Sequence, residues 1–545
     1  MFDDKLKTHI AEVLSKLGLA ETEVDLAVPR DPSHGDATTT IAMSLAKEVG
    51  RNPRELATEI TEAIDKRDAQ LDAVEVAGPG FINFRYGAGW YDDRLRAIVR
   101  EADTYGRSDA LEGQRILLEF VSANPTGPLN IVSARAAAVG DAIASLLQAA
   151  GCEVHREFYV NDAGVQVEKL ARSVDARIRE LSGEPLEIPE GGYHGEYLRD
   201  IAQQIVETHA GITSKDDDAR LERLKELAVE KMVAWQRRDL DMYGVAFNRW
   251  FHETELGERV DRTLEALKET GETYESEGAV WLKTTPHGTN DDKVIVKADG
   301  YPTYLLPDLA YHIDKFDRGY DPAIDLWGPD HHAHIAEMHA ALEILGHAKE
   351  QLEVQIIQQV NFLEGGERVK MSKRAGAIVT LRELCEDVGV DVAKFFFLMR
   401  KQTSHLDFDL DLAREQSDEN PVFYVQYGHA RVASLIRFAH ERGTSVPDAD
   451  SVDLTDVTTG DARVLILLLA DFPRLIAGAA EAREPHRLTT YLRDVASQFH
   501  KYYHDNRIVS DDAAATDARL FLSEATRTVL ANGLTLLGIS APDRM

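Results

Sequence analysis

Residues 115–160 read RILLEFVSANPTGPLNIVSARAAAVGDAIASLLQAAGCEVHREFYV, and this stretch decides the fold. It holds an apolar run with strand character at 115–124, a long apolar segment of helical periodicity at 133–151, and a second apolar run at 152–160. A strand, a helix and a strand in this order form a βαβ unit, in which the two strands lie parallel. The stretch therefore predicts an α/β domain built on a parallel sheet.

Strand patterns return after a long helical interruption. They occur at AVWLKT (279–284), KVIVKADGYPTYLL (293–306), AIDLWG (323–328) and LEVQIIQQVNFL (352–363). The interruption, about 165–270, is dominated by charged segments of helical periodicity. We therefore expect a Rossmann-like domain at 109–390 with a helical insertion at about 165–270, and a sheet that finishes near residue 362.

Two further domains flank this one. Residues 1–108 combine helical patterns with the strand-like EVAGPGFINFRY, in which Gly78-Pro79-Gly80 is a turn by its chemistry. After about residue 390 no convincing strand pattern remains, and the periodicity is helical. We expect an N-terminal α+β domain at 1–108 and a C-terminal α-helical bundle at 391–545.

Length and composition describe a multidomain globular protein. A chain of 545 residues is too long for one hydrophobic core, and roughly three or four domains are expected. With 44% apolar and 28% charged residues, each domain can bury a core. The first residues lack the apolar stretch of a signal peptide, and no run of about 18 apolar residues follows. We expect a cytoplasmic protein without membrane contact.

The cysteines give no sign of a metal or disulfide framework. Only Cys152 and Cys385 occur, and they lie far apart without the paired spacing of a zinc site. We expect both to be buried as small apolar residues, and no structural metal bound by the protein.

The net charge of −33 restricts the partners that the surface can attract. It arises from 94 Asp and Glu against 61 Lys and Arg. Phosphate contacts depend on Lys and Arg, so this surface argues against nucleic-acid binding. Carboxylates spread over the whole chain also suit molar salt, where the screening length falls to about 3 Å. Two readings stay open: an acidic protein that never meets RNA, and a salt-adapted protein whose RNA contacts are local.

The loop between the first strand and its helix is the first candidate site. It runs Ser122-Ala123-Asn124-Pro125-Thr126-Gly127-Pro128-Leu129-Asn130, and the next helix turns its free amides back over the sheet. Such a helix N-terminus binds phosphate. Two prolines and a glycine fix this loop tightly, although a purely structural turn is the alternative.

A basic loop far downstream is the second candidate site. The strand pattern at 352–363 is followed by Gly365-Gly366 and then by Arg368-Val369-Lys370-Met371-Ser372-Lys373-Arg374. Lysines at the mouth of a parallel sheet stabilise the charge that develops on the leaving group when an α-phosphate is attacked. A solvated basic loop is the alternative.

Together these two loops resemble the signatures of class I aminoacyl-tRNA synthetases. KMSKR at 370–374 is similar to their second signature, and SANPTGPLNIVSAR lies where their HIGH signature belongs. The similarity to arginyl-tRNA synthetases extends over essentially the full chain. It includes HGDATTTIAMSLAK, VAGPGFINF, FYVNDAG, YHGEYL, DGYPTYLLPDLAY, WGPDHH and NPVFYVQYGHARVASL, the last of which resembles the family's helical anticodon-binding domain.

The resemblance implies an enzyme that activates arginine with ATP to arginyl-adenylate and transfers it to the 3′-terminal adenosine of tRNA(Arg). It implies tRNA(Arg), arginine and ATP as partners, ATP with Mg²⁺ as the substrate complex, and a monomer. It also implies that tRNA is bound before arginine is activated. The acidic composition adds a halophilic archaeon as the expected source.

The resemblance assigns site residues by position. Around arginine it places Glu119, Asn124, Tyr304 and Asp308, with carboxylates that match the planar fork of a guanidinium. The catalytic residues that it implies are Asn130, Ser133, Lys370, Ser372 and Lys373. The ATP-binding residues are Ala123, Asn124, Pro125, Thr126, Gly127, Pro128, Leu129, Asn130, Ile131, Val132, Ser133, Asp330, His331, His332, Lys370 and Met371.

Several of these residues also have plainer readings. Without the resemblance, Glu119 reads as a salt-bridged strand carboxylate, and Tyr304 and Asp308 as ordinary packing. A zinc site at His331, His332 and His334 is a weaker alternative, because no ligand spacing accompanies them. Tyr424 and Tyr427 suit stacking on anticodon bases, although core packing is the alternative.

The chain departs from its family in the first signature. Where the family reads His-x-Gly-His, this sequence has Asn130-Ile131-Val132-Ser133. Asn130 and Ser133 keep hydrogen-bonding groups without the charge of an imidazole, and Val132 adds bulk where the adenine would lie. The departure motivates a rival function, a non-catalytic synthetase-like protein that binds tRNA or arginine. A third reading is an adenylate-forming or nucleotidyl-transferring enzyme with another substrate.

Overall fold

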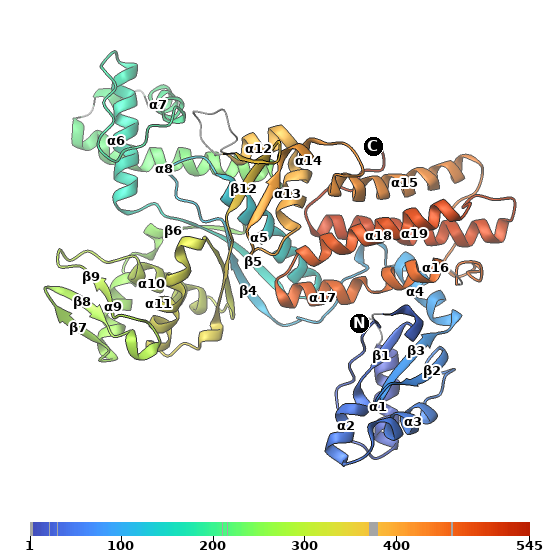
Figure 1. Ribbon diagram of the computed structural model, residues 1–545. Coiled ribbons are helices and arrows are strands. Elements are labelled where there is room, and N and C mark those ends of the chain that lie inside the picture. Colours follow the sequence, from blue (N-terminus) through green and yellow to red (C-terminus); the bar gives the residue numbers. More distant parts are fainter. Residues whose placement is uncertain are drawn as a thin grey trace.

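The computed structural model describes residues 4–20, 22–29, 31–209, 211–214, 216–369, 380–458 and 461–545. Three regions follow one another along the chain (Figure 1). An N-terminal module, in blue, lies below the C-terminal helices, in orange and red, and a parallel sheet with its helices forms the remaining body. The predicted combination of an α+β module, an α/β domain and a helical bundle is confirmed.

The N-terminal module is an antiparallel sheet covered by helices. Its strands lie in the order β1 (Ala37–Thr39), β3 (Phe81–Tyr86) and β2 (Leu71–Ala77). The helical elements are α1 (Asp4–Lys16), η1 (Pro32–His34), α2 (Ile41–Val49) and α3 (Pro53–Ala63). The predicted turn joins β2 to β3, and Gly78 and Gly80 both have positive φ, which a side chain would disfavour. Helix α4 (Ala88–Glu101), followed by η2 (Ala102–Thr104), then packs the module onto the C-terminal helices.

The predicted βαβ unit is the centre of a five-stranded parallel sheet. The strand order is β11 (Leu352–Ile356), β10 (Ala323–Trp327), β4 (Arg115–Glu119), β5 (Glu153–Val160) and β6 (Arg249–His252). Helix α5 (Ile131–Ala149) connects β4 to β5, and the helices on either side of β10 are α10 (Leu305–Asp317) and α11 (His332–Ile344). The chain order changes direction between β4 and β10. In open α/β sheets, ligands bind at such a switch point, outside the carboxyl ends of the strands.

Two of the expected sheet strands belong to a separate sheet. β8 (Ala279–Leu282) and β9 (Lys293–Val296) pair antiparallel with each other and, through β8, with β7 (Thr273–Ser276). The expectation that the parallel sheet finishes near residue 362 is also wrong, because its last strand, β11, ends at Ile356. The strand pattern beyond it is β12 (Val360–Glu364), which lies in a third sheet with β13 (Glu367–Val369) and β14 (Leu406–Asp409).

Two strands appear where only helices were expected. β14 follows residue 390, and β6 lies inside the 165–270 segment yet forms an edge of the parallel sheet. Each has only four residues. Four residues give too few alternations for a period of two to stand out against the surrounding helical periodicity.

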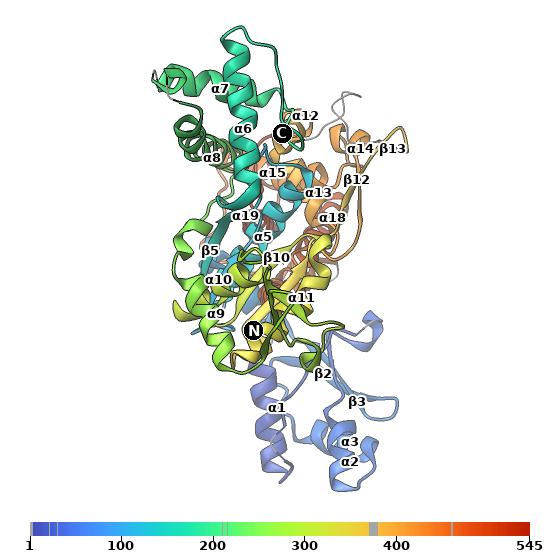
Figure 2. The ribbon, with the colours of Figure 1, turned by 90° about the vertical axis from the view of Figure 1, so that its left-hand side faces the viewer.

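The chain between β5 and β6 forms a helical lobe of its own. Its elements are α6 (Gly164–Leu181), α7 (Tyr197–Thr208), η3 (Ile212–Ser214) and α8 (Asp217–Met242). They enclose a separate apolar cluster made by Leu170, Val174, Ile178, Leu198, Ile201, Leu224 and Leu227, among others. Figure 2 shows this lobe at the opposite end of the molecule from the N-terminal module. After β6, η4 (Glu253–Leu256), α9 (Arg259–Glu269) and η5 (Thr285–His287) lead into the separate sheet and its connections.

Helices dominate the chain after η7 (Lys349–Gln351) and the third sheet. They are α12 (Leu381–Val388), α13 (Val390–Leu398), α14 (Leu410–Arg414), α15 (Pro421–Glu441), α16 (Asp461–Ala470), α17 (Phe472–Ala482), α18 (His486–Asp505) and α19 (Ala513–Leu536). α13 and α17 pack on α5, so the bundle and the sheet domain share one core. α5 is long and apolar enough to span a membrane by composition, but 83% of that window is buried inside the protein. Cys152 and Cys385 are free and buried, as predicted.

Candidate active site

The loop after β4 is shaped by unusual backbone conformations. Val121 and Ser122 have φ of 71° and 37°, in the left-handed region that side chains disfavour. Such conformations persist where the surrounding structure holds them, and they cluster at functional sites. Here the Ser122 hydroxyl donates to Glu119 Oε1 at 2.7 Å and accepts from the Tyr159 backbone amide at 3.1 Å. The loop is thereby fastened to the ends of β4 and β5.

Helix α5 begins immediately behind this loop. Asn130 is its N-cap, and its side-chain oxygen accepts from the Ser133 backbone amide at 2.9 Å. The Asn130 side chain therefore satisfies one of the free amides of the helix, which is a common role for asparagine at this position. Ser133 is nearly buried, with 9% of its surface exposed. The residues that replace the charged histidines of the family signature thus build the start of the helix.

A cavity of about 500 Å³ opens in front of the loop. Of the predicted residues it collects Asn124, Tyr304, Asp308, Asp330 and His331. The other lining residues are Ser122, Tyr159, Asn161, Gln166, Glu253, Pro307 and His334. We call it the amino-acid cavity, after the ligand that the sequence resemblance predicts for it. Its lining is mainly polar and comes from the loop after β4, the end of β5, the turn after β10, α6, η4, α10 and α11.

A second cavity of about 230 Å³ adjoins the first and shares Asp330 and His331 with it. Its lining includes Asn130, Val132 and Ser133 at the start of α5, together with Val121, Ala136, Leu326, Trp327, Gly328, Pro329, Ile357 and Gln359. Most of these residues come from β10 and from the segments that follow β4 and β10, and Ile357 and Gln359 follow β11, so the cavity lies at the switch point of the sheet. We call it the switch-point cavity. Val132 faces it, where the sequence predicts added bulk.

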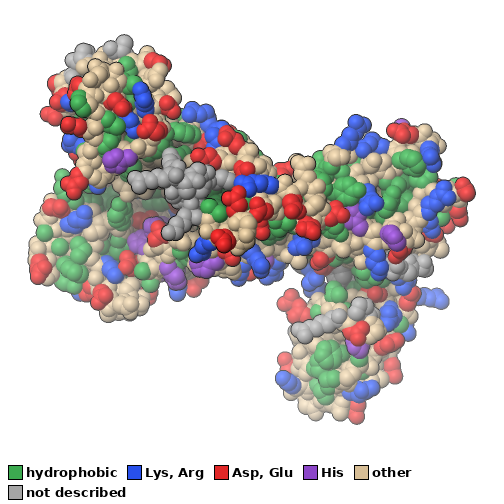
Figure 3. Space-filling model, turned by 45° about the horizontal axis from the view of Figure 1, so that its top comes forward, with side chains coloured by type: hydrophobic (Ala, Val, Ile, Leu, Met, Phe, Trp, Pro, Cys, Tyr) green, Lys and Arg blue, Asp and Glu red, His purple; other side chains and the backbone are tan. Residues whose placement is uncertain are grey.

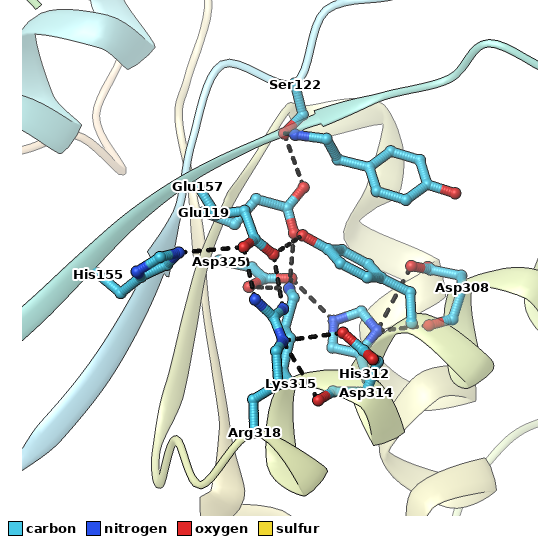
Figure 4. Close-up of polar contacts among 12 residues, drawn as sticks. Glu119, Ser122, His155, Glu157, Asp308, His312, Asp314, Lys315, Arg318 and Asp325 are labelled. Atoms are coloured by element: carbon cyan, nitrogen blue, oxygen red, sulfur yellow. Dashed lines mark hydrogen bonds and ion pairs between the residues drawn. The ribbon is translucent and has the colours of Figure 1, made fainter. Parts of the chain in front are cut away.

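Glu119 is engaged behind the amino-acid cavity rather than lining it. It is 7% exposed, and its Oε2 accepts from Lys315 Nζ at 2.6 Å. Lys315 is fully buried and donates also to both oxygens of Asp325, at 2.8 and 2.9 Å (Figure 4). Burial raises the pKa of Glu119 although Lys315 opposes the rise. Burial also disfavours ionised Asp325, but Lys315 and His312 outweigh it and hold its pKa at about 2.

Asp308 projects from α10 into the amino-acid cavity and is surrounded by imidazoles. His312 Nδ1 donates to the Asp308 carbonyl at 2.7 Å and lies 3.4 Å from Oδ1, while its Nε2 donates to Asp325 at 2.8 Å. His334 Nε2 donates to Asp308 Oδ2 at 2.9 Å. Burial disfavours the charged carboxylate, but His312 and His334 outweigh burial and keep the pKa of Asp308 below its ordinary value. The cavity therefore presents an ionised carboxylate.

A second ion cluster supports the same wall of the cavity. Glu157 on β5 is fully buried and accepts from both terminal nitrogens of Arg318, at 2.7 and 2.8 Å, and from the Tyr311 hydroxyl at 2.8 Å. Burial opposes its ionisation, but these bonds hold the pKa of Glu157 far below its ordinary value. The cluster joins α10 and the residue that follows it to β5, which lies next to the edge strand β6 of the parallel sheet (Figure 4).

Several cavity residues were not predicted from the sequence. Glu253 is the most distinctive: burial raises its pKa, and the nearby Asp162 and Asp308 raise it further although the Tyr159 hydroxyl donates to it. Asn161 and Tyr159 belong to the FYVNDAG stretch, which entered the resemblance without a role for its members. Glu253 had no sequence signal, and His334 entered only as an alternative zinc ligand, because both are distant in the chain from Asp308 and come near it only through the fold.

The basic loop falls largely outside the described residues. Lys370, Met371, Ser372 and Lys373 belong to that stretch. The described chain resumes at Thr380, which pairs with Asn130, and the Leu381 amide donates to the Leu129 carbonyl at 2.9 Å. The chain after the basic loop therefore returns to the start of α5.

The remaining predicted residues lie on separate surfaces. His332 opens α11 and lines neither cavity. Tyr424 and Tyr427 lie on α15, with their rings 5.2 and 6.0 Å from the His500 ring, and Tyr427 is 36% exposed. Tyr424 packs against the core and Tyr427 reaches the surface. Within the described residues, no group of three His, Cys, Asp or Glu side chains could hold a metal ion.

Acidic side chains are distributed over every part of the visible surface (Figure 3). This agrees with a net charge that is spread along the chain rather than confined to one tail. A polyanionic ligand would therefore meet local binding groups rather than a broad positive field.

Comparison with known proteins gives three matching families along the chain. They are described as "Arginyl tRNA synthetase N terminal domain" over residues 4–86, "tRNA synthetases class I (R), catalytic domain" over 94–406 and "DALR anticodon binding domain" over 425–545. The middle match contains both cavities and both ion clusters.

Named relatives cover nearly the whole chain. The arginine--tRNA ligase of Symbiobacterium thermophilum is 48% identical over 525 residues, which are 96% of this chain and 94% of that protein. The arginine--tRNA ligase of Shouchella clausii is 44% identical and covers 99% of each chain. Among solved structures, a putative arginyl-tRNA synthetase from Campylobacter jejuni has a TM-score of 0.78 at 32% identity, covering 84% of this chain and all of that one. The Thermus thermophilus arginyl-tRNA synthetase superposes over both full chains with a TM-score of 0.76 at 22% identity, which supports the fold.

Proposed function

The chain belongs to the arginyl-tRNA synthetase family and is an arginine--tRNA ligase, and we propose that its two adjoining cavities hold arginine and ATP for the first step of that reaction. The observation that carries the proposal is an ionised Asp308 in one cavity and the N-terminus of α5 at the other, with Asp330 and His331 shared between them. A cationic side chain suits the first and a phosphate suits the second.

The first step follows from this placement. An oxygen of the arginine carboxylate attacks the α-phosphorus of ATP in line, and the bond from that phosphorus to the oxygen bridging to the β-phosphate breaks. The products are arginyl-adenylate and pyrophosphate. Positioning and electrostatic stabilisation supply the catalysis, since no enzyme group need bond to the substrate. In the second step the 2′-hydroxyl of the terminal adenosine of tRNA attacks the arginyl carbonyl, and AMP leaves.

Arginine lies in the amino-acid cavity under this proposal. The Asp308 carboxylate receives the guanidinium, whose planar fork offers five donors and pairs with a carboxylate through two of them. Asn124 serves the α-amino end, and the exposed Tyr304 covers the entrance. Glu119 contributes from behind, because it fixes Ser122, which lines the cavity, at 2.7 Å.

ATP lies with its base in the switch-point cavity and its phosphates before α5. Asn130 and Ser133 present the helix N-terminus, and Asp330 and His331 contact the nucleotide from the turn after β10. Val132 lines the switch-point cavity, whereas Ala123–Leu129, Ile131 and His332 are assigned to ATP by their position in the sequence alone. The remaining residues of the proposal, Lys370, Met371, Ser372 and Lys373, would stabilise pyrophosphate from the basic loop. Mg²⁺ would enter with ATP as the substrate complex.

Transfer RNA(Arg) is the third partner under this proposal. Its elbow would meet the N-terminal module, and its anticodon would meet the helical domain near Tyr424 and Tyr427, where bases stack on aromatic rings. We propose the cytoplasm as the location and a monomer as the functional unit.

A non-catalytic relative that only binds tRNA or arginine is the second candidate. It is favoured by one observation, that Asn130 uses its side-chain oxygen to cap α5 and neither it nor Ser133 carries the charge of an imidazole. ATP turnover separates the two functions.

The deciding experiment is arginine-dependent exchange of pyrophosphate into ATP, measured on the purified chain in molar KCl with and without homologous tRNA(Arg). We expect exchange, and we expect it to require tRNA. Folded protein that binds tRNA but shows no exchange under either condition would assign the chain to the non-catalytic alternative.

A further inference from the structure

His334 stands where the substrate guanidinium should bind. It lies in the first turn of α11 and borders the amino-acid cavity, with 18% of its side chain exposed. Its Nε2 lies 2.9 Å from Asp308 Oδ2. Asp308 Oδ1 lies 3.4 Å from His312 Nδ1. Each oxygen of the carboxylate therefore already faces an imidazole.

A guanidinium bound side-on needs both oxygens of the carboxylate at once. His312 is buried behind Asp308, and its Nε2 is fixed to Asp325, so it stays in place whatever fills the cavity. His334 reaches Asp308 from the cavity side. Of the two imidazoles, His334 is the one that competes for the space and for the oxygen that the substrate requires.

The surroundings of His334 favour its charged form. Its second nitrogen, Nδ1, lies 3.2 Å from Glu337 Oε2, so both ring nitrogens face carboxylates. A neutral imidazole has one N–H and could donate to only one of them. Burial lowers the pKa of His334, but Asp308 and Glu337 outweigh burial and raise it above its ordinary value. Glu337 is itself held ionised by Lys293, whose Nζ lies 2.8 Å away.

An aromatic ring and several charged groups also surround His334. Its ring lies 5.5 Å from the Trp327 ring of β10, which carries no charge. The ionisable groups that line the same cavity or contact Asp308 and Glu337 are Asp308 and His312 on α10, Tyr304 at its start, Glu337 on α11, Lys293 on β9, Tyr159 on β5, Asp330 and His331 in η6 (Pro329–His331), and Glu253 in η4. Asp308 and Glu337 are the two that contact its nitrogens directly.

We propose that the His334 imidazolium occupies the guanidinium subsite of the empty pocket, and that arginine binds by displacing it from Asp308 with loss of its proton to solvent. This inference rests on the proposed function, because it takes Asp308 as the guanidinium acceptor. The displacement has a consequence for specificity, because a ligand must bind Asp308 more strongly than the imidazolium does. A planar cation that donates two hydrogen bonds to the carboxylate meets this condition, whereas a neutral side chain leaves the His334–Asp308 ion pair in place.

The displacement makes arginine binding depend on pH in a direction that the geometry fixes. Below the pKa of His334 a proton competes with arginine, so the apparent KM for arginine should fall roughly tenfold for each unit that the pH rises. Above that pKa the imidazole is neutral and the KM should level. Asp308 stays ionised throughout, because its own pKa lies below the ordinary value.

Steady-state aminoacylation by the full chain with tRNA, in molar KCl between about pH 6 and about pH 8.5, tests the proposal with L-arginine as the varied ligand. His334→Gln keeps one donor towards Asp308 but carries no proton that titrates here. We expect its KM for arginine to be independent of pH and, at about pH 6, several-fold below that of the unmodified chain. The KM for ATP should follow the same pH course in both proteins.

A second variant acts without touching Asp308. Glu337→Gln removes one of the two carboxylates that favour the imidazolium, so the pH at which the arginine KM levels should move lower. A purely structural role for the Glu337–His334 contact would leave that pH unchanged. The matched control is His339→Gln on the same helix. His339 Nε2 donates to the Leu352 carbonyl at 3.1 Å, and this contact does not line the amino-acid cavity. The control should therefore keep the pH dependence of the arginine KM that the unmodified chain shows.

The outcomes separate the inference from its premise. If His334→Gln retains the pH slope while Asp308→Asn raises the arginine KM, the pocket assignment stands and the displacement of His334 is refuted. If Asp308→Asn leaves the arginine KM unchanged, the pocket assignment fails and the inference fails with it. If the pH dependence of the arginine KM disappears in His334→Gln, and the pH at which this KM levels moves lower in Glu337→Gln, the pocket assignment and the displacement of His334 are both supported.

Discussion

Replacing Lys315 with methionine should destabilise the fold and weaken arginine binding together. The Lys315 ammonium is fully buried and is the cation between Glu119 and Asp325. Methionine fills similar volume without charge and leaves these two carboxylates facing each other. Removing one partner of a buried ion pair costs about 3–5 kcal/mol. His312 still donates to Asp325, so we expect the lower end, about 3 kcal/mol in the free energy of unfolding.

The loss of unfolding free energy in Lys315→Met should depend on pH, and the pKa values determine whether it grows or shrinks as the pH falls. With Lys315 and His312 overcoming the effect of burial, the pKa of Asp325 is about 2, against an ordinary value of 3.8. A depressed folded-state pKa stabilises the protein above the unfolded-state pKa, and this stability is lost as the pH falls through the folded value. In Lys315→Met the buried carboxylates gain protons more easily. The difference between the two proteins should therefore be widest near neutral pH and should narrow on acidification towards about pH 4.

Urea unfolding followed by tryptophan fluorescence in molar KCl measures this difference. The matched control is Lys225→Met, which removes an exposed pair with Glu222 at 2.8 Å and should cost at most about 1 kcal/mol. Combining Lys315→Met with Glu119→Gln should recover part of the loss, because one of the stranded charges is removed. If Lys315→Met is as stable as the Lys225→Met control near neutral pH, the buried cluster does not hold the site together as we infer.

Three further substitutions test the site and its frame. Asp308→Asn removes the charge offered to the guanidinium, and aminoacylation kinetics should show an arginine KM raised about 10- to 100-fold with little change in the KM for ATP; an equal rise in both would point to a general collapse of the site. Val132→Gly enlarges the switch-point cavity of about 230 Å³, and the KM for ATP in pyrophosphate exchange should fall severalfold, whereas an unchanged value would place the adenine elsewhere. Arg135→Met should lower the free energy of unfolding by roughly 3 kcal/mol in urea titrations, because the buried guanidinium donates to the carbonyls of Gln358 and Ser404, which lose these bonds; a loss below about 1 kcal/mol would show that they find other partners. The Lys401 carbonyl, which also accepts from Arg135, keeps the Ser404 amide as a donor.

The sequence predicts the frame of the site because its strongest signals are local. The strand, loop and helix of residues 115–160 are contiguous, and their periodicities change sharply at the loop, so the βαβ unit and its helix N-terminus follow directly. The assignment of β8 and β9 to the parallel sheet failed for the opposite reason. Periodicity predicts that a segment is a strand but not which strand it pairs with, because pairing depends on contacts distant in the chain.

The site residues also divide into those with a local sequence signal and those that depend on contacts distant in the chain. Asn124, Tyr304, Asp308, Asp330 and His331 were predicted by position and do meet at one cavity. The ionic partners of the cavity were not predicted, because Glu119 meets Lys315 across 196 positions and a buried lysine looks like any other lysine in a sequence. The alternative reading of Glu119 as a salt-bridged strand carboxylate is confirmed, but its partner Lys315 and the use of Asn130 as a helix cap become visible only in three dimensions.

Helix α10 resolves a conflict that any pocket for a cationic amino acid must face. The pocket needs an ionised carboxylate, yet burial raises the pKa of a carboxylate and favours its neutral form. Asp308, His312 and Lys315 lie four and then three positions apart, on one face of α10. The anion is nearest the cavity, and the two cations lie behind it, buried and fixed to Asp325.

This order along the helix has a functional reason. A cation fixed in front of Asp308 would exclude the substrate, which is why His334, on the cavity side, must be displaced under our proposal. Cations behind Asp308 favour its charged form and remain out of reach of the guanidinium. A well-packed apolar set in place of the buried ion cluster is often as stable or more stable, since buried ion pairs seldom repay their desolvation. The cluster has another effect, because His312 and, to a smaller extent, Lys315 lower the pKa of Asp308 and so favour the charge by which a guanidinium is bound. The cluster is therefore explained by the charge of the substrate rather than by the stability of the fold.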